Sequence, residues 1–507
     1  MSTLDYIVLL AYLIGVIWVG LRMSGKQVSV KDYFLGGKDL PWWAVCFSIV
    51  ATETSTLTII GIPAVAFGGT MVFLQITIGY LLGRTIVALV FLPRYFAGEL
   101  TTAYDYLGQR FGPRMQTLSS ITFMGTRLLA DGVRLFATAI PLKVIADSTG
   151  MDVGYPIIIV SIGLLTMSYT YMGGLKAVVW MDVIQMGLYL LAAIGSIWVL
   201  LSNLPEGGLA ILEASGKLMV FDFGNWEINS ILTQPYVFVT AVIGGGIFSM
   251  ASHGTDHLIV QRLLACRTLA DSKKALIGSA FIVALQFAIF LVVGALLWVY
   301  YGGASLAELG LSRGDEVFPR FILEGLPSGV SGLVLAGILA AAMSTLSSSL
   351  NALASSTLTD VLSKVRAWNE ANYNPLKASR LITLMWGIVF MFFATLFEDQ
   401  KNPVVELGLS IASFTYGSLL GAFVLGMLSE RVKEKEAMIA FGLTIIVMVG
   451  VIFGVWYGPD TGWIFVFKPD AAVIAAGNLK SIAWPWYTAI GSVITIVVGT
   501  SLSYLHK

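Results

Sequence analysis

The sequence predicts an all-α polytopic membrane protein of about thirteen transmembrane helices, with the N-terminus outside and the C-terminus inside (N-out/C-in). Of its 507 residues, 57% are hydrophobic and only 12% are charged, against about 25% charged in a soluble domain. Apolar runs of about 20 residues, long enough to cross a ~30 Å hydrocarbon core, recur along the whole chain. The 30 basic residues balance the 30 acidic ones, which argues against a nucleic-acid partner.

The apolar runs place the spans to within a few residues. The predicted spans are 5–22, 41–67, 71–96, 115–147, 153–172, 178–201, 234–259, 275–301, 327–362, 379–397, 405–428, 436–457 and 482–504. No basic residues precede the first apolar run and no small-residue cleavage site follows it, so we interpret it as a retained span and not as a signal peptide. The longest connections, 202–233 and 302–326, are predicted to be external.

The lysine and arginine residues test this topology independently, because cytoplasmic loops are enriched in them. Twenty of the thirty fall on the predicted inside, seven fall outside, and three lie within spans: Arg84, Arg127 and Arg134. The inside group includes Lys26, Arg262, Arg366 and Lys507, and the outside group includes Lys401. This asymmetry supports thirteen crossings.

Two spans contain residues that do not suit a continuous lipid-facing helix. Six of the eight residues at 51–58 carry a hydroxyl or carboxyl group, and Gly61 and Pro63 follow. The seventh span carries Gly244-Gly-Gly246 and then a polar group that ends with His253 and Gly254. Irregular backbone inside a membrane survives only where it lines protein or water. Paired interrupted helices of this kind indicate the midplane binding site of a transporter.

A stripe of hydroxyl groups marks the ninth span. Ala341, Ser344, Thr345 and Ser348 are three or four residues apart, so they share one helix face. Oxygen ligands on one face suit a small hard cation, although small residues also serve close helix packing. Asp182, at the start of the sixth span, is either a functional intramembrane carboxylate or an interfacial helix cap.

Glu53 is the carboxylate that lies deepest in the broken second span. It has four open roles: neutralising a solute amine, accepting hydrogen bonds from hydroxyls, carrying a coupling proton, or pairing with one of the three intramembrane arginines. Arg127, Asp131 and Arg134 share one helix face, which favours a structural salt-bridge ladder. Alternatively, these arginines hold a solute carboxylate, for which the guanidinium fork is suited.

Three further motifs are weak. His253 and His257 have the H-x-x-x-H spacing, but Gly254 stands where a zinc protease has Glu. Ser331 in Gly329-Val-Ser-Gly332 is better explained as a helix cap than as a protease nucleophile. No Gly-Lys pair is followed by Ser or Thr, so the sequence predicts no nucleotide site. The sequence therefore predicts neither an enzyme nor a transition-metal protein.

Several short motifs recur together: Lys31-Asp-Tyr-Phe-Leu-Gly-Gly37, Gly61-Ile-Pro-Ala64, Thr102-Ala-Tyr-Asp-Tyr-Leu107, Tyr169-Thr-Tyr-Met-Gly-Gly174, Trp180-Met-Asp-Val-Ile-Gln185, Val260-Gln-Arg262 and the Ser344–Asn351 run. With them the chain resembles the solute:sodium symporter family over nearly its whole length, closest in spacing to the sialic acid transporter branch of bacteria. The resemblance implies the leucine-transporter fold with a 5+5 inverted repeat. It implies one domain over 1–507, with an extra helix at 5–22, a ten-helix core at 41–428 and two C-terminal helices at 436–504.

The resemblance also implies ion ligands. A first sodium ion would be bound by Ala51, Thr54, Ala341, Ser344 and Thr345. A second, present in some members, would be bound by Asp182, Ser344, Ser347 and Ser348. One or two sodium ions are therefore expected, with no nucleotide and no transition metal.

The solute positions implied by the sialic acid branch are Glu53, Ser55, Thr58, Gln75 and Thr77, and we add Arg127 and His253 as candidates. Two departures make sialic acid itself a poor fit: Glu53 replaces a hydroxyl residue, and the family arginine that binds the carboxylate aligns with Ala130. A carboxylate in the pocket favours a cationic, zwitterionic or polyhydroxyl solute unless an arginine cancels its charge.

The sequence thus predicts a sodium-coupled symporter that imports a small polar organic solute, such as a sugar, sugar acid or amino acid, across a bacterial cytoplasmic membrane. Its partners would be the solute and the lipid bilayer, with no nucleic acid, and we expect a monomer to suffice. The alternatives are a proton-coupled transporter that uses Glu53, a non-transporting solute sensor and an intramembrane hydrolase. The chain stops shortly after the last span without a kinase domain, which argues against the sensor.

Overall fold

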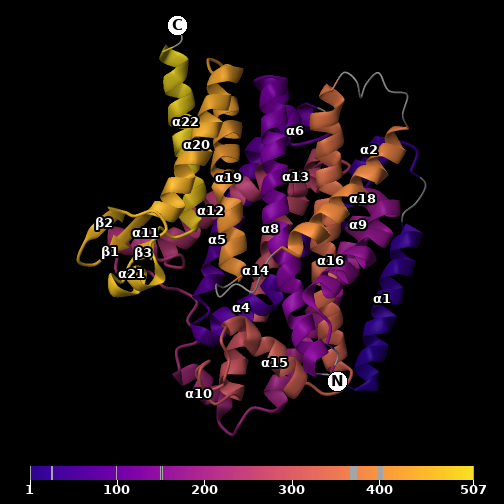
Figure 1. The fold of residues 1–507 in the computed structure, drawn as a ribbon, viewed down its shortest axis with the longest axis vertical. Helices are drawn as coiled ribbons and strands as arrows, with labels where there is room; N and C mark the ends of the chain where they lie inside the picture. The colour runs from indigo at the N-terminus through magenta and orange to yellow at the C-terminus, as the bar shows by residue number, and fades with distance from the viewer. Residues whose placement is uncertain are drawn as a thin grey trace.

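The structure is a computed structural model that describes residues 2–23, 27–98, 100–148, 150, 152–365, 374–396 and 404–505. It is a bundle of long helices, with a small sheet at one side (Figure 1). Four residues of the charge count, Lys26, Arg366, Lys401 and Lys507, lie outside the described residues.

Each of the thirteen predicted spans coincides with helix. The helices are α1 (Thr3–Met23), α3 (Trp42–Glu53) with α4 (Thr56–Gly68), α5 (Ile76–Ile86) with α6 (Leu92–Ala97), α8 (Pro113–Ser148), α9 (Tyr155–Ser202), α12 (Gly245–Gly254) with α13 (His257–Leu264), α14 (Leu269–Tyr300), α16 (Val330–Ser356), α18 (Pro375–Ala394), α19 (Val404–Leu428), α20 (Glu434–Gly454) and α22 (Pro485–Leu505). The connections contain α2 (Val30–Leu35), α7 (Asp105–Arg110), α10 (Gly208–Ala214), α11 (Ile228–Thr233), α15 (Val317–Glu324) and α21 (Ala471–Ala476).

Helix α9 contains the two predicted spans 153–172 and 178–201. Its 48 residues would extend about 72 Å if straight, more than twice the hydrocarbon thickness. Gly174, with φ 56° and ψ −163°, divides the helix between the two spans. Within the described residues, length and composition alone identify eight membrane-crossing helices, or nine with the bent pair α3–α4. This count is lower than thirteen because it treats α9 as one helix, passes over the polar or interrupted spans, and includes α19 only as the shorter apolar helix Thr415–Leu428.

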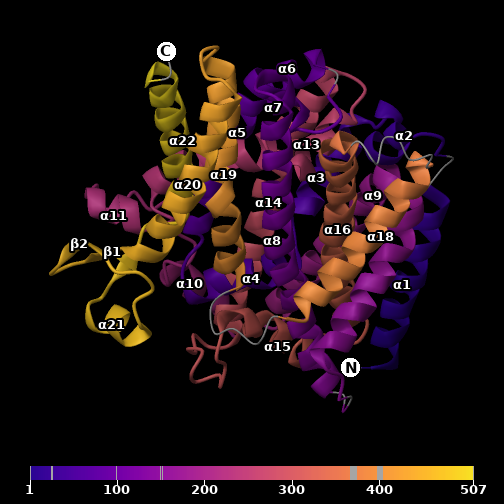
Figure 2. The same cartoon turned by 45° about the horizontal axis from the view of Figure 1, so that its top comes forward.

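The two ends of the bundle differ as the predicted topology requires. The N-terminus lies at the same end as α10 and α15, which belong to the predicted external connections, whereas the C-terminus lies at the other end with α2, α6 and α7 (Figures 1 and 2). Termini at opposite ends fit an odd number of crossings.

A three-stranded antiparallel sheet in the order β2-β1-β3 joins α20 to α22, and the sequence reading did not predict it. Its strands are β1 (Val455–Gly458), β2 (Gly462–Phe465) and β3 (Lys480–Ser481). In the β1–β2 hairpin, Val455 pairs with Phe465 and Gly458 with Gly462. The predicted span 436–457 therefore ends three residues earlier as a helix, at Gly454.

Helix α16 runs through the centre of the bundle and contacts α1, α3, α8, α9 and α18. Its N-terminal end is bound by α1, because the Asp5 carboxylate accepts hydrogen bonds from the Gly329 N–H (2.7 Å), the Gly332 N–H (3.0 Å) and the Ser331 hydroxyl (3.1 Å). The Gly-Val-Ser-Gly motif is thus part of a helix N-terminus whose orphan N–H groups are satisfied by a neighbouring helix.

Candidate functional site

The second span is broken at Thr54 and Ser55, where the sequence predicts an interruption. Helix α3 ends at Glu53 and α4 begins at Thr56, with a bend of 67° between them. Both intervening residues have extended backbone, with ψ of 104° at Thr54 and 175° at Ser55. Because the chain leaves the helix here, the carbonyls of the last turn of α3 lose their i+4 N–H partners. Such carbonyls can bind a cation.

The break runs alongside the hydroxyl stripe of α16. The Thr52 hydroxyl lies 3.2 Å from the Ser348 hydroxyl, and the Thr56 hydroxyl donates to the Ile338 carbonyl at 3.3 Å. The candidates Ala341, Ser344 and Thr345 are buried on the stretch between these two contacts. The structure therefore brings the two halves of the implied first sodium set, Ala51 with Thr54 and the α16 residues, to the same place.

A glutamine that the sequence reading did not single out holds the break. Gln286 on α14 donates from Nε2 to the Thr54 hydroxyl at 2.6 Å, and its Oε1 accepts from the Tyr189 hydroxyl at 3.1 Å. The Thr54 hydroxyl in turn donates to the Val50 carbonyl at 2.8 Å. Thr54 is therefore fixed through its side chain, which leaves its carbonyl oxygen available.

Asp182 is fully buried on α9 and lies within the candidate second sodium set. It accepts from the Ser48 hydroxyl at 2.5 Å and from the Ser344 hydroxyl at 2.6 Å. Arg262 Nη2 lies 3.3 Å from Asp182 Oδ2 and also donates to the Ser348 hydroxyl. Ser347, the fourth predicted ligand, donates to the Ser344 carbonyl at 3.0 Å. A guanidinium thus bridges two of the predicted ligands.

The placement of Arg262 corrects the sequence reading, which counted it among the inside loop charges. The chain restarts as a helix at His257 after the break at Thr255 and Asp256, and α13 carries Arg262 into the bundle with no exposed surface. Asp182 is 80 residues away in the chain, so this pairing has no local sequence signal. The Asp182 carboxylate is buried and is not an interfacial helix cap.

A cavity of about 120 Å³ opens beside the break. It is lined by Thr52, Glu53, Ser55, Leu57, Thr58, Ile62, Phe73, Tyr80, Arg127, Arg134, Phe248, Ser252, His253, Leu258, Ile259, Phe287 and Tyr416. Five of the seven solute-binding candidates are in this lining: Glu53, Ser55, Thr58, Arg127 and His253. The sequence did not predict the aromatic side chains of this lining. An aromatic residue in a membrane helix gives the same sequence pattern whether it faces a cavity, a neighbouring helix or lipid.

The remaining candidates, Gln75 and Thr77, lie outside the cavity lining. Gln75 donates to the Tyr236 carbonyl, and its Oε1 accepts from the Asp222 N–H at 3.4 Å, so it ties the external connection to α5. The Thr77 hydroxyl donates to the Leu74 carbonyl at 2.7 Å. Both side chains serve local structure in this conformation.

Of the four roles left open for Glu53, the structure shows internal pairing with an arginine. Arg84 Nη2 lies 2.7 Å from each carboxylate oxygen, and Arg84 Nη1 donates to the Ser279 hydroxyl at 2.6 Å. Arg84 has no exposed surface, whereas the Glu53 side chain is 22% exposed towards the cavity. The carboxylate is therefore present in the pocket with its charge cancelled.

Close helix packing brings Arg84 to this position. A Cβ on its neighbour Gly83 would lie 2.2 Å from the Gly246 carbonyl oxygen, so only glycine allows α5 to approach α12 so closely. The sequence predicted an interruption of the seventh span from Gly244–Gly246 and the polar group that ends with His253 and Gly254. The structure instead shows these residues within helix, and the interruption lies later, at Thr255 and Asp256.

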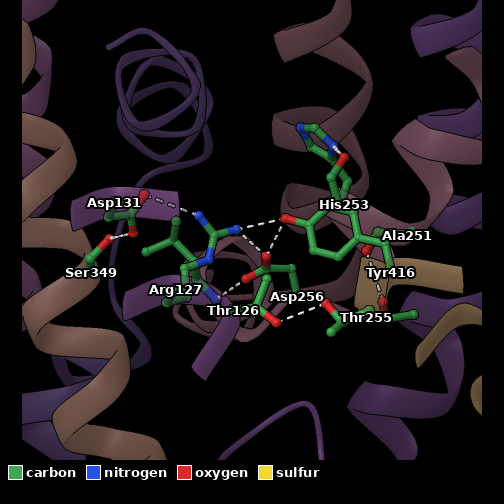
Figure 3. A network of polar contacts seen from close by, with 12 residues as sticks. Thr126, Arg127, Asp131, Ala251, His253, Thr255, Asp256, Ser349 and Tyr416 are labelled. Carbon is green, nitrogen blue, oxygen red and sulfur yellow. Dashed lines mark hydrogen bonds and ion pairs between the residues drawn. The ribbon is translucent and has the colours of Figure 1, made fainter. Parts of the chain in front are cut away.

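A second charge network joins α8, the second break and α19, and its Arg127, Arg134 and Tyr416 side chains also line the cavity (Figure 3). Arg127 binds Asp256 at the second break and lies 3.7 Å from Asp131. Tyr416 on α19 joins it, since its hydroxyl donates to Asp256 at 2.6 Å and accepts from Arg127 at 2.7 Å. Arg134 pairs with Asp131 at 2.9 Å, so the predicted ladder of Arg127, Asp131 and Arg134 is confirmed.

The two histidines of the H-x-x-x-H motif have different surroundings. His257 accepts from the Ala103 N–H at 3.3 Å through Nδ1 and contacts the Ser355 hydroxyl at 3.3 Å through Nε2. His253 contacts Ser252 and faces the cavity. Within the described residues, no group of three or more His, Cys, Asp or Glu side chains could hold a metal ion.

Comparisons with known proteins agree with this geometry. A family model described as the sodium:solute symporter family matches residues 33–444. The sodium/sialic acid symporter NanT of Aliivibrio fischeri is 28% identical over 100% of this chain and 94% of its own length. The human sodium/iodide cotransporter is 29% identical over 90% of this chain and 70% of its own length. A solved Na⁺-coupled sialic acid symporter, in a substrate-bound outward-open state, superposes with a TM-score of 0.81 and 27% identity over 99% of this chain and 98% of its own.

Proposed function

The chain belongs to the sodium:solute symporter family and is a sodium-coupled membrane symporter with the leucine-transporter fold, and we propose that the solute it imports is a small organic carboxylate. It is a transporter and not an enzyme, as predicted. The observation that carries the proposal is the charge balance around the cavity, where Arg84 cancels Glu53 and the arginine Arg134 reaches the cavity surface.

We place the first sodium ion between the break and α16, with the Ala51, Thr54 and Ala341 carbonyls and the Ser344 and Thr345 hydroxyls as ligands. Hydroxyl and carbonyl oxygens are suitable ligands for a hard cation. The Thr345 hydroxyl donates to the Ala341 carbonyl at 3.1 Å and the Ser344 hydroxyl to Asp182 at 2.6 Å, so each oxygen still has a lone pair for an ion. This set contains no carboxylate, and the bound ion leaves one positive charge uncompensated.

The charges that surround the cavity are otherwise balanced. Glu53 is paired with Arg84, while Asp131 and Asp256 balance Arg127 and Arg134. A monovalent anion would neutralise the bound sodium ion, and in a low-dielectric site this attraction links the binding of the two. Both relatives named above carry an anion, sialic acid or iodide, in line with this proposal.

Arg134 is the residue we propose to receive the carboxylate. Its side chain is 20% exposed, against 7% for Arg127. It also lines a smaller hollow together with Ser55 and Thr345, so a carboxylate bound there would lie near a proposed sodium ligand. The guanidinium fork suits a carboxylate in geometry as well as in charge.

The second sodium ion would bind to Asp182, Ser344, Ser347 and Ser348. Because Arg262 already contacts Asp182 and Ser348, an ion there would have to displace this guanidinium. Two sodium ions with one monocarboxylate carry a net charge of +1, worth about 2.3 kcal/mol per 100 mV, whereas one sodium ion makes the cycle electroneutral. Transport current per solute therefore reports the number of ions.

The arrangement of the helices, the number of copies and the membrane location belong to the same proposal. The core of ten helices would span 41–428, with the helix at 5–22 before it and the pair at 436–504 after it. We propose that one copy in the lipid bilayer of a bacterial cytoplasmic membrane carries out transport. The proton-coupled alternative through Glu53 is less well supported, because Arg84 Nη2 lies 2.7 Å from both carboxylate oxygens.

The test is uptake into proteoliposomes of the purified full-length chain, with butyrate, gluconate, glucose and alanine as labelled probes. We expect uptake of a carboxylate under an inward sodium gradient and none under a proton gradient in potassium buffer. The variant Arg134→Gln should lose carboxylate binding at saturating sodium. Uptake of the uncharged sugar or the zwitterion in preference to both carboxylates would contradict the proposal, as would uptake driven by protons alone.

A further inference from the structure

One end of the cavity contains a buried ring nitrogen that lacks a hydrogen-bond partner. His253 is 1% exposed and contacts the Ser252 hydroxyl at 2.8 Å through Nδ1. Within the described residues its Nε2 atom has no hydrogen-bond partner, and the nearest charged group, Glu53 Oε1, lies 3.6 Å away. That separation is too long for a hydrogen bond. A buried polar atom without a partner is costly, so this end of the cavity is suited to a ligand that supplies one.

We propose that a hydroxyl group of the solute binds between Glu53 and His253, which makes the solute a hydroxycarboxylate. This inference rests on the proposed function, since it places the carboxylate at Arg134 and assigns a second polar group in the same cavity. Glu53, His253, Ser252 and Arg134 all line that cavity. The lining also includes Phe73, Phe248 and Phe287, which accommodate a carbon chain.

A hydroxyl fits because it both donates and accepts. Glu53 accepts the hydroxyl proton, using lone pairs that remain after its contacts with Arg84. In the tautomer in which Nδ1 accepts from the Ser252 hydroxyl, the His253 Nε2–H group is left to donate to the hydroxyl oxygen of the solute. One ligand atom therefore satisfies both side chains.

Charged groups fit this end less well. An ammonium group would place a second cation beside Arg84, whose guanidinium already contacts both Glu53 oxygens, and it would offer no acceptor to His253. A carboxylate would be repelled by Glu53. Both side chains also lie at the carboxyl ends of half-helices, α3 and α12, where the negative end of the helix dipole adds to the repulsion of a carboxylate.

Figure 3 shows the His253 ring apart from the second charge network. The His253 ring turns away from Arg127 and Asp256, towards which Tyr416 is directed. His253 can therefore be changed without removing a partner of that network.

The experiment measures ligand affinity of the purified full-length chain in sodium buffer by calorimetry. The probes are 4-hydroxybutyrate, 5-hydroxypentanoate and 6-hydroxyhexanoate, each compared with its unsubstituted carboxylate and its ω-amino acid. At the best chain length we expect the hydroxy acid to bind about tenfold more tightly than the unsubstituted acid, as one added hydrogen bond to a charged group allows. The amino acid should have no such advantage.

Variants then assign the preference to residues. His253→Phe should lose the tenfold preference for the hydroxy acid over the unsubstituted acid, whereas Arg134→Gln should weaken both series equally. Thr444→Val is the matched control, because the Thr444 hydroxyl contacts Thr495 at 2.8 Å, between α20 and α22 and away from the cavity lining, and it should behave as the wild type.

Three results would overturn the inference. The inference is wrong if the wild type binds the hydroxy acid and the unsubstituted acid with equal affinity at every chain length. It is also wrong if the wild type binds the ω-amino acids more tightly than the hydroxy acids. A hydroxyl preference that survives in His253→Phe would remove the histidine from the site. Absence of sodium-dependent binding by any carboxylate would instead overturn the proposed function, and this inference with it.

Discussion

The two broken spans are held in opposite ways. At the first break, every recorded side-chain contact of Thr54 and Thr56 is to an uncharged group: Gln286 and Val50 for Thr54, and Ile338 and Thr138 for Thr56. At the second break, the Asp256 carboxylate accepts from Arg127, from Tyr416 and from the Leu258 N–H at 2.9 Å. The backbone of the first break is held by hydroxyl groups beside the Glu53–Arg84 pair, whereas that of the second is held by the buried Asp256 carboxylate itself.

This difference separates two tasks. Side-chain hydroxyls fix the first break while its main-chain carbonyls remain available, which is what an ion site needs. The charge at the second break is fully engaged by α8 and α19, so this break anchors α13 to neighbouring helices. In the proposed sodium site the first break contacts the ion, whereas the second anchors α13 to α8 and α19.

The largest expected effect comes from breaking the second anchor. Asp256→Ala leaves Arg127 buried with the Tyr416 hydroxyl at 2.7 Å and the Asp131 carboxylate at 3.7 Å, and removal of one partner of a buried pair costs about 3–5 kcal/mol. We expect a loss of about 3 kcal/mol in stability, measured by thermal unfolding in detergent, because Asp131 compensates in part.

Asp256→Asn is the control that separates the ion pair from the helix N-cap. It removes the charge, but its amide oxygen can still accept from the Leu258 N–H and should preserve the N-cap. A change of less than about 1 kcal/mol in Asp256→Ala would show that the pair is not an anchor.

The sequence predicted the first break at the correct residues and the second only within its span. Threonine and serine side chains compete with the helix backbone for hydrogen bonds, so the run at 51–58 carried its own local signal. Glycine has two uses in a membrane helix, interruption and close approach. The sequence analysis interpreted Gly246 as part of an interruption. The structure instead shows that Gly246 lies where α12 closely approaches Gly83 of α5.

The partners of the charged residues could not be predicted from local spacing, except where they share a helix. Arg127, Asp131 and Arg134 follow one another on α8, and their ladder was predicted. Arg84 with Glu53, and Arg262 with Asp182, join residues on different helices, 31 and 80 positions apart. Their pairing depends on the fold. The neutralisation of Glu53 by Arg84 therefore could not be predicted from the sequence.

The next effect concerns the first break and its ion. Thr345→Val replaces a proposed sodium ligand with a side chain of similar shape, and we expect the sodium concentration for half-maximal uptake to rise about tenfold, about 1.4 kcal/mol. Thr444→Val is the control, because the Thr444 hydroxyl contacts Thr495 at 2.8 Å, between α20 and α22. If both variants retain the wild-type sodium dependence, the first sodium ion does not bind to Thr345.

The smallest effect concerns the residue that positions this break. Gln286→Leu removes the 2.6 Å bond to the Thr54 hydroxyl but leaves the bond from Thr54 to Val50, so the Thr54 carbonyl loses part of its fixation. We expect a rise of about fivefold in the half-saturating sodium concentration, equivalent to about 1 kcal/mol for one hydrogen bond. The solute KM at saturating sodium should not change, because Gln286 is absent from the cavity lining. Tyr189→Phe removes only the outer bond to Gln286, at 3.1 Å, and should have a smaller effect in the same direction. A change in solute KM without a change in sodium dependence would place Gln286 in the solute site, and the contrast between an ion-contacting first break and an anchoring second break would then need another basis.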